Sequence, residues 1–312
     1  EVARRRFDIM RSRVANDNKL RKKLLAALAG TPFESVRSFA EILADLVLGG
    51  DGQLKECVVA LSGTNIRRAL DLLEGFSIST HTDLEQLFRM HVKQSQGRSS
   101  GGLGLDLFLR SAMRGTGSRY VEQTSTIVNL FQASLARVNS HFTRARILQL
   151  LNWRLRQSYD NKDIRVADVV SELGSIGHRA DDVDRALSYM GARGLVNSTS
   201  SQEPPWDFGH AVHIGAAGHY YLTTLIYNRE YQNNVADDIV VYDEATLEGM
   251  RVVQLDRALD WPMKNERKVR AVLAYLARAE RVELRRVKAE WLEPIAEDLG
   301  CRRFGTIFRK EI

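Results

Sequence analysis

The chain has 312 residues, and its 45 Lys and Arg outnumber its 39 Asp and Glu, giving a net charge of +6. Its apolar content of 44% and charged content of 27% are ordinary for a globular protein. No apolar run approaches the roughly 18 residues of a membrane span, which argues against a membrane protein. Cys57 and Cys301 lie far apart and match no metal-binding spacing. We therefore expect reduced thiols, a cytoplasmic location and two or three domains.

The positive charge is concentrated at both ends. Residues 1–23 carry nine Lys or Arg and three Asp or Glu, and residues 264–312 carry thirteen and eight, which is +6 and +5. The middle is therefore 6 − 6 − 5 = −5. Basic ends suit nucleic acid or an acidic partner, and solvated helix faces would carry the same pattern.

Residues 1–95 have the apolar spacing of a bundle of short helices. One of these helices has two arginines in its first turn. Asn65 is a good N-cap, because its side chain can accept a hydrogen bond from a free N–H of the first turn. Arg67 and Arg68 follow in that turn, where the helix macrodipole disfavours cations. An anion bound at the helix start would offset the unfavourable position of these two cations. Alternatively, both arginines are solvated and lie beside acidic residues.

The rest of the chain divides into a connector, a helix–strand segment and a further helical region. Residues 96–140 are predicted to form the connector, with a short helix near Phe108 and an apolar, β-prone patch at 127–131. Residues 141–222 are predicted to contain three helices and short strands. These elements are a first helix around Ile147, a strand at 164–166, helices at 166–174 and 181–193, a strand from 194 and its partner at 210–214. Residues 223–312 are predicted to be helical, with helices at 266–281 and 287–299, and we expect Trp261 and Trp291 to be packing residues.

The stretch 62–71, SGTNIRRALD, resembles the sensor-2 helix of AAA+ ATPases, especially the origin-recognition/initiator branch or related STAND-like proteins. The resemblance implies that residues 1–95 are an AAA+ lid domain. It also implies that Arg67 reaches the γ-phosphate of ATP, which a preceding core domain would bind together with Mg²⁺. No GxxxxGK[ST] occurs in the chain, so we expect the P-loop core to precede Glu1 in a longer protein.

Residues 141–222 resemble a winged helix-turn-helix with a small β-hairpin wing, most clearly in ALSYMGARGLV at 186–196 and IGAAGHYYL at 214–222. In such folds the third helix enters the DNA major groove, which makes Arg179, Arg185 and Arg193 the candidate DNA contacts. However, residues 178–203 carry three arginines and four acidic residues, a net −1. Because DNA binding needs phosphate neutralisation, DNA and a protein partner both remain open as targets.

No catalytic or metal-binding motif is present: HExxH, CxxC and GxSxG are all absent. His210, His213 and His219 lie close in sequence, but the spacing of the first two puts them on opposite faces of a strand. The sequence therefore predicts a mainly α protein that forms the C-terminal part of a P-loop ATPase and assembles as a homo-oligomer or with a protein partner. Its lid would sense ATP and its winged helix would pass that state to DNA or to a partner, with bacterial anti-phage defence as the favoured setting. The alternatives are a non-enzymatic winged-helix DNA-binding regulator and a scaffold that assembles through an acidic winged helix.

Overall fold

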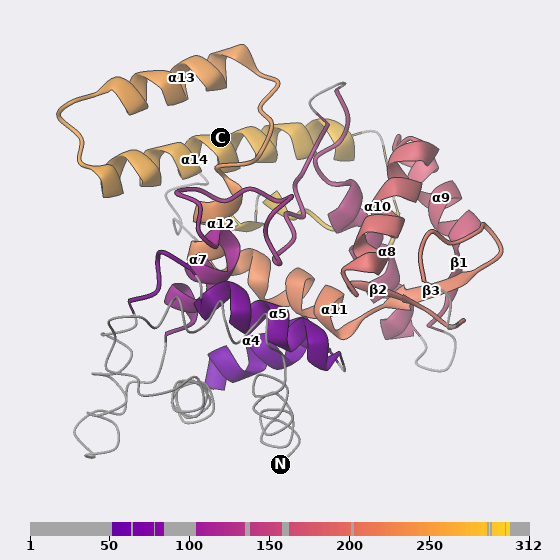
Figure 1. Ribbon diagram of the computed structural model, residues 1–312. Helices are drawn as coiled ribbons and strands as arrows, with labels where there is room; N and C mark the ends of the chain where they lie inside the picture. The colour runs from indigo at the N-terminus through magenta and orange to yellow at the C-terminus, as the bar shows by residue number, and fades with distance from the viewer. Residues whose placement is uncertain are drawn as a thin grey trace, which may run out of the picture. The chain divides into compact units, whose positions relative to one another are not determined.

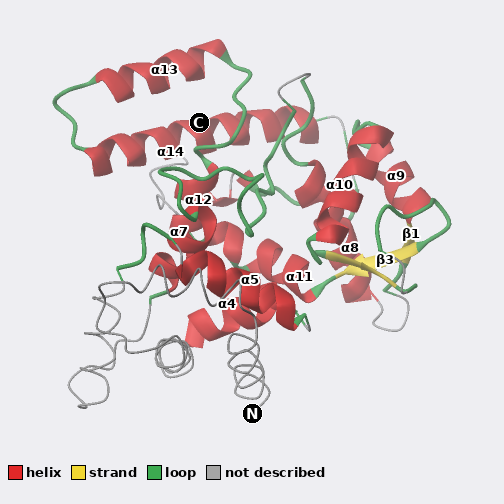
Figure 2. Ribbon diagram, in the orientation of Figure 1, coloured by secondary structure: helices red, strands yellow, loops and turns green. Residues whose placement is uncertain are grey.

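The computed structural model describes residues 52–63, 65–77, 79–83, 104–134, 138–157, 162–200, 203–285, 287, 289–296 and 298–299. The expectations for the basic segment 1–23 and for Cys301 lie outside these residues. The described part is mainly helical with one small three-stranded sheet (Figures 1 and 2), as the sequence predicts. The chain divides into two compact units, Glu1–Ile127 and Val128–Ile312, and this division falls inside the segment predicted to be a connector.

The first unit contains the helices α4 (Gly52–Ser62), α5 (Ile66–Ser77) and α7 (Leu105–Arg114), which pack against one another. Their shared core is apolar, and the rings of Phe76 and Phe108 lie 5.6 Å apart between centroids. After α5, the Ser79 hydroxyl donates to the Gly115 carbonyl at 2.7 Å, and His81 Nε2 lies 2.8 Å from the Gly117 carbonyl. His81 therefore helps to hold the end of α7 beside the end of α5.

The second unit contains a helix–strand module whose elements follow in a fixed order. They are α8 (Thr143–Gln157), β1 (Ile164–Arg165), α9 (Val166–Ser175), α10 (Ala180–Ala192), β2 (Val196–Ser198) and β3 (Ala211–Ile214). The strands form an antiparallel sheet in the order β1-β3-β2. The turns that precede and follow α10 contain Gly177 (φ 96°) and Gly194 (φ 61°), a left-handed conformation that favours glycine.

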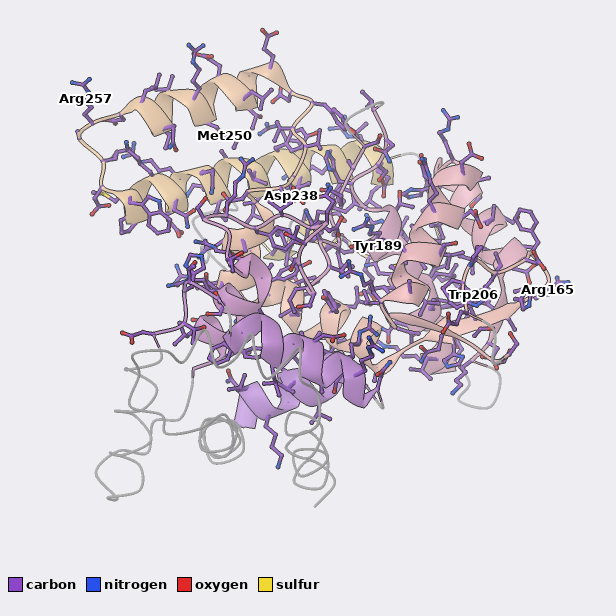
Figure 3. The ribbon with its side chains drawn as sticks, viewed as in Figure 1. Arg165, Tyr189, Trp206, Asp238, Met250 and Arg257 are labelled. Atoms are coloured by element: carbon purple, nitrogen blue, oxygen red, sulfur yellow. The ribbon has the colours of Figure 1, made fainter. Side chains whose placement is uncertain are left out.

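The loop between β2 and β3 lies against the C-terminal end of α10. Trp206 in this loop is buried, and a Cβ atom on Gly191 would lie within 3.0 Å of three atoms of its indole ring. Only glycine leaves room for the ring at this position of the helix. Gly191 and Trp206 therefore fix residues 203–210 against α10 (Figure 3).

The segment 128–131, part of the predicted β-prone patch, is buried without forming a strand. Its backbone N–H and C=O groups form hydrogen bonds with side chains instead. The Tyr221 hydroxyl accepts from the Val128 N–H at 2.7 Å, and the Tyr231 hydroxyl accepts from the Leu130 N–H at 3.1 Å and donates to the Val128 carbonyl at 3.0 Å. Buried backbone groups need such partners, and here two tyrosines replace a neighbouring strand.

The remaining helices of this unit lie after β3 in the chain. They are α11 (Ala216–Thr223), the short η1 (Leu225–Tyr227), α12 (Arg229–Val235), α13 (Glu244–Leu255) and α14 (Trp261–Leu284). Asn228, Asp243 and Asp260 each accept backbone N–H groups at the starts of α12, α13 and α14. The helices α13 and α14 pack side by side as a hairpin (Figure 1).

Two predictions for the C-terminal region are wrong. The predicted helix at 287–299 is not helical at residues 289–294, where the structure has turns and irregular chain. Pro294 interrupts the pattern, and the N–H groups of Ile295 and Ala296 bind a carboxylate rather than helix carbonyls. Trp291 is buried as predicted, but Trp261 is 66% exposed, because it lies on the first turn of α14, directly after the loop that joins α13 to α14.

Candidate functional site

The residue that carries the nucleotide prediction, Arg67, lies in the first turn of α5. Asn65 caps this helix, as predicted, and its Oδ1 accepts from the Arg68 N–H at 3.2 Å. On the opposite side of the helix, Leu72, Leu73 and Phe76 are buried against α4 and α7. Arg67 is exposed and has no hydrogen-bond or ionic partner among the described residues. The helix is thus anchored by its apolar side while Arg67 extends from its positive end.

The three DNA-contact candidates lie at α10 but do not form a free cationic surface. Arg179 is exposed just before the helix, Arg185 binds Asp182 and the Asp181 carbonyl, and Arg193 stacks on Tyr189 at 5.2 Å from the ring centroid. Neighbouring positions on the helix are acidic. From the start of α8 to just after β3, residues 143–215, the module carries nine Lys or Arg and nine Asp or Glu, a net charge of 0, and the part after α8, residues 162–215, carries five and eight, which is −3. The segment that contains α10 therefore lacks the excess of positive charge that phosphate binding requires.

A buried cationic centre that the sequence did not indicate joins α8 to α14. Arg146 of α8 is fully buried. Its Nη2 lies 2.6 Å from Glu280 Oε1 and its Nε lies 2.9 Å from Glu283 Oε1. Because an unpaired buried charge is very unfavourable, these contacts require α14 to stay in place beside α8.

Further hydrogen bonds tie the segment 293–296 to the same centre. Arg146 Nη1 donates to the Glu293 carbonyl at 2.7 Å, and Gln149 Nε2 donates to that carbonyl at 2.9 Å. The Glu280 carboxylate in turn accepts the N–H groups of Ile295 and Ala296 at 2.8 and 2.7 Å. All three nitrogens of Arg146 and both carboxylate oxygens of Glu280 have hydrogen-bond partners, so we interpret the cluster as a structural clamp rather than a reactive site.

Two histidines lie next to this clamp and are held neutral. His178 Nδ1 is 3.0 Å from the Thr143 hydroxyl, and its Nε2 is 3.8 Å from Glu283 Oε1. Burial lowers the pKa of His178, with Glu283 acting in the opposite direction. Burial also lowers the pKa of His141, which is bonded to the Phe131 carbonyl and the Tyr275 hydroxyl at 3.1 and 2.8 Å. Neither has the exposed, poised position of an acid–base catalyst.

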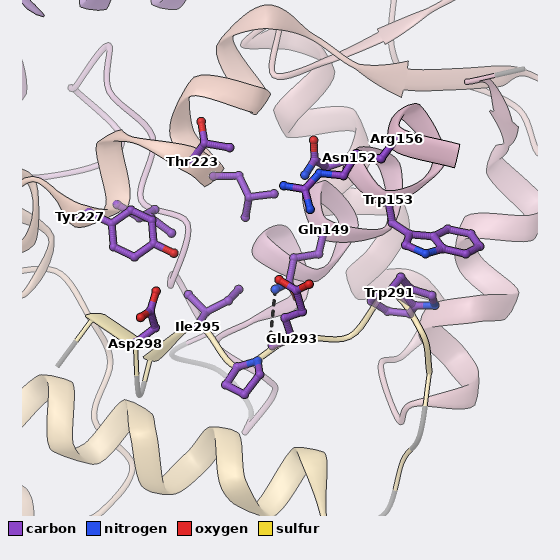
Figure 4. Close-up of a pocket in the computed structure, with 13 residues that line it drawn as sticks. Gln149, Asn152, Trp153, Arg156, Thr223, Tyr227, Trp291, Glu293, Ile295 and Asp298 are labelled. Carbon is purple, nitrogen blue, oxygen red and sulfur yellow. Dashed lines mark hydrogen bonds between the residues drawn. The ribbon is translucent and has the colours of Figure 1, made fainter. Parts of the chain in front are cut away.

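A cavity of about 330 Å³ lies between α8, the α11–η1 segment and residues 291–298 (Figure 4). Its lining combines aromatic rings with polar groups of both charges. The residues that line it are Gln149, Asn152, Trp153, Arg156, Leu222, Thr223, Ile226, Tyr227, Trp291, Glu293, Pro294, Ile295 and Asp298. The hydrogen bond from Gln149 to Glu293 forms part of its wall, so the cavity shares residues with the Arg146 clamp.

The three neighbouring histidines have separate partners. His213 Nδ1 is 2.9 Å from Asp163 Oδ1, His219 Nδ1 is 3.0 Å from Asn152 Oδ1, and His210 Nδ1 accepts from the backbone of Asp207 at 3.0 Å. In the part of the chain that the structure describes, His, Cys, Asp and Glu do not gather into a group that could hold a metal ion. Nor does any described helix combine the length and apolar character of a membrane span.

Comparisons with protein-family models, with curated proteins and with solved structures find no match to this chain. The AAA+ and winged-helix resemblances therefore rest on the residues quoted for them.

Proposed function

We propose that this chain is the nucleotide-sensing and partner-binding part of an AAA+ or STAND-like P-loop ATPase. The observation that carries the proposal is Arg67, an exposed arginine in the first turn of a helix that Asn65 caps and whose far side is buried. An exposed cation on an anchored helix is suited to stabilising charge on a γ-phosphate brought to it by a core domain. Under this proposal ATP and Mg²⁺ are bound mainly by a P-loop core domain.

The test is Arg67→Ala in the full-length protein, with ATP hydrolysis as the readout. Removing one charge-stabilising group should lower kcat by about 10²- to 10³-fold while circular dichroism stays unchanged. Arg68→Ala is the matched control, because it removes a cation from the same turn, and it should retain turnover. Unchanged hydrolysis in Arg67→Ala would refute the sensing role. The proposed setting in phage defence predicts that the same variant loses protection when phage are plated on cells that carry the protein.

We further propose that the helix–strand module is a winged helix-turn-helix that binds a protein partner. The order of its elements from α8 to β3 and the sheet order β1-β3-β2 support this assignment. The charge of −3 over residues 162–215 and the internal pairing of Arg185 with Asp182 favour protein over DNA.

DNA is the second candidate, because Arg179 is exposed at the start of α10 and the winged fold commonly places this helix in the major groove. Fluorescence anisotropy with duplex DNA at 50 and 200 mM salt separates the two. We expect weak binding that Arg179→Ala does not change. Tight binding that falls steeply with salt and is lost in Arg179→Ala would instead establish DNA as the target.

A further inference from the structure

The helix α13 gains little burial from the rest of the second unit. The structure describes all twelve of its residues, and only Thr246 is buried. Met250 lies on the side of α13 that faces α14 (Figure 3), while Leu247, Val252 and Leu255 are 48%, 59% and 67% exposed. A helix of this length is marginally stable without packing, and Gly249 in its middle weakens it further. We therefore expect a partner to cover the outer side of α13.

The first turn of α14 adds two exposed apolar side chains near the loop that joins α13 to α14. Trp261 and Met263 are 66% and 47% exposed. Lys264 Nζ donates to the Gln254 carbonyl at 2.9 Å, which places this turn beside the end of α13. We call the set Leu247, Val252 and Leu255 on the outer side of α13 the hairpin face. Exposed apolar side chains that are grouped in this way mark interaction sites more often than scattered ones do.

The charges on the outer side of α13 identify the partner. Glu248 and Arg251 are exposed there, with Arg251 Nη1 3.6 Å from Glu248 Oε2 in the same helix. If a second α13 lies antiparallel across a twofold axis near the middle of the helix, each Glu248 comes toward the partner's Arg251. The same arrangement brings the Leu247 end of each helix to the Leu255 end of the other. The surface is thus complementary to itself in both charge and apolar character, as an isologous contact requires.

We propose that the hairpin face binds the hairpin face of a second copy of this chain, with α13 antiparallel to α13 in a twofold-symmetric dimer. This contact involves none of the residues assigned to nucleotide sensing or to the winged helix, so it stands or fails independently of the proposed function. A 12-residue helix is about 18 Å long. The interface is therefore at the small end of the range for specific complexes, and we expect a dissociation constant on the order of 10 μM or weaker.

The first test is sedimentation velocity of the chain from about 1 to 300 μM, a range chosen to bracket the expected dissociation constant. We expect a monomer–dimer equilibrium, and Leu255→Lys should weaken it at least about tenfold. Phe208→Lys is the matched control, because Phe208 is an exposed apolar residue (60%) of the loop between β2 and β3, outside the α13–α14 hairpin. A chain that stays monomeric throughout, or equal weakening by both variants, overturns the proposal.

The second test distinguishes a second copy from a different partner. Glu248→Arg and Arg251→Glu should each weaken the dimer about three- to tenfold, because each places like charges across the interface. The double variant E248R/R251E restores opposite charges both within the helix and across the twofold axis, and should recover the wild-type dissociation constant. Failure of the double variant to recover, with circular dichroism showing intact helices, would refute the antiparallel arrangement.

Discussion

Replacing Arg146 with methionine removes the cation at the centre of the second unit while keeping much of its volume. Two acidic side chains then lose their partner: Glu280, whose side chain is 2% exposed, and Glu283, which is 12% exposed. Glu280 keeps the N–H groups of Ile295 and Ala296, but its negative charge is no longer balanced within the protein.

The expected loss of stability is large. Breaking a buried ion pair by removing one partner costs about 3–5 kcal/mol. With a urea m value of about 2–3 kcal/mol/M for a domain of this size, the unfolding midpoint should fall by roughly 1–2.5 M. The same replacement at Arg278 should move the midpoint far less, because the pair that Arg278 makes with Asp243 is 54% and 40% exposed and is screened by solvent.

Urea denaturation followed by tryptophan fluorescence is a suitable assay, because Trp291 is buried close to the clamp. The double variant R146M/E280Q should be more stable than R146M alone, since it also removes the unbalanced carboxylate. A shift in R146M no larger than in R278M, or a double variant less stable than R146M, would show that Arg146 does not act as a clamp.

Three further outcomes test separate parts of the fold. Asn65→Ala should destabilise α5 by about 1 kcal/mol, because it removes the N-cap, and this can be measured by hydrogen exchange of the helix amides; unchanged exchange would contradict the cap. Gly191→Ala should cost about 1–3 kcal/mol and expose Trp206, seen as a red-shifted fluorescence, and an unaltered spectrum would mean that the indole does not rest on α10. Burial lowers the pKa of His178, so below about pH 6.5 the unfolded chain binds a proton that the folded chain resists; the free energy of unfolding should fall as pH drops below that value, and less steeply in His178→Gln. Equal slopes for the wild type and this variant would argue against a neutral, buried His178.

Local patterns were sufficient to predict most of the helices. The apolar spacing around Phe108 and Ile147 predicts α7 and α8, and Asn65 predicts the start of α5 correctly. The short strand at 164–165 is also found, because it is a β-branched step directly before a helix. In each case the signal lies within one or two turns of chain.

Long-range features could not be predicted in this way. The sequence pattern does not distinguish Arg146 from the other arginines of its helix, because its partners Glu280 and Glu283 are more than 130 residues away. The error at 287–299 has the same origin, since the carboxylate that binds the N–H groups of this segment belongs to α14. Trp261 was expected to pack because tryptophan usually does, and its exposure next to the loop that joins α13 to α14 follows from tertiary structure alone.

The sequence separation within the Arg146 clamp also determines when it can form. Arg146 is 134 and 137 residues from its two acidic partners and 147 from the Glu293 carbonyl. During synthesis the helix–strand module is therefore completed well before the groups that neutralise its buried arginine leave the ribosome. Until then α8 must either keep Arg146 in solvent or remain loosely packed, so the module is vulnerable to proteolysis and to chaperone binding during this interval. During synthesis, Arg146 can therefore be neutralised only after α14 and the segment that follows it have emerged.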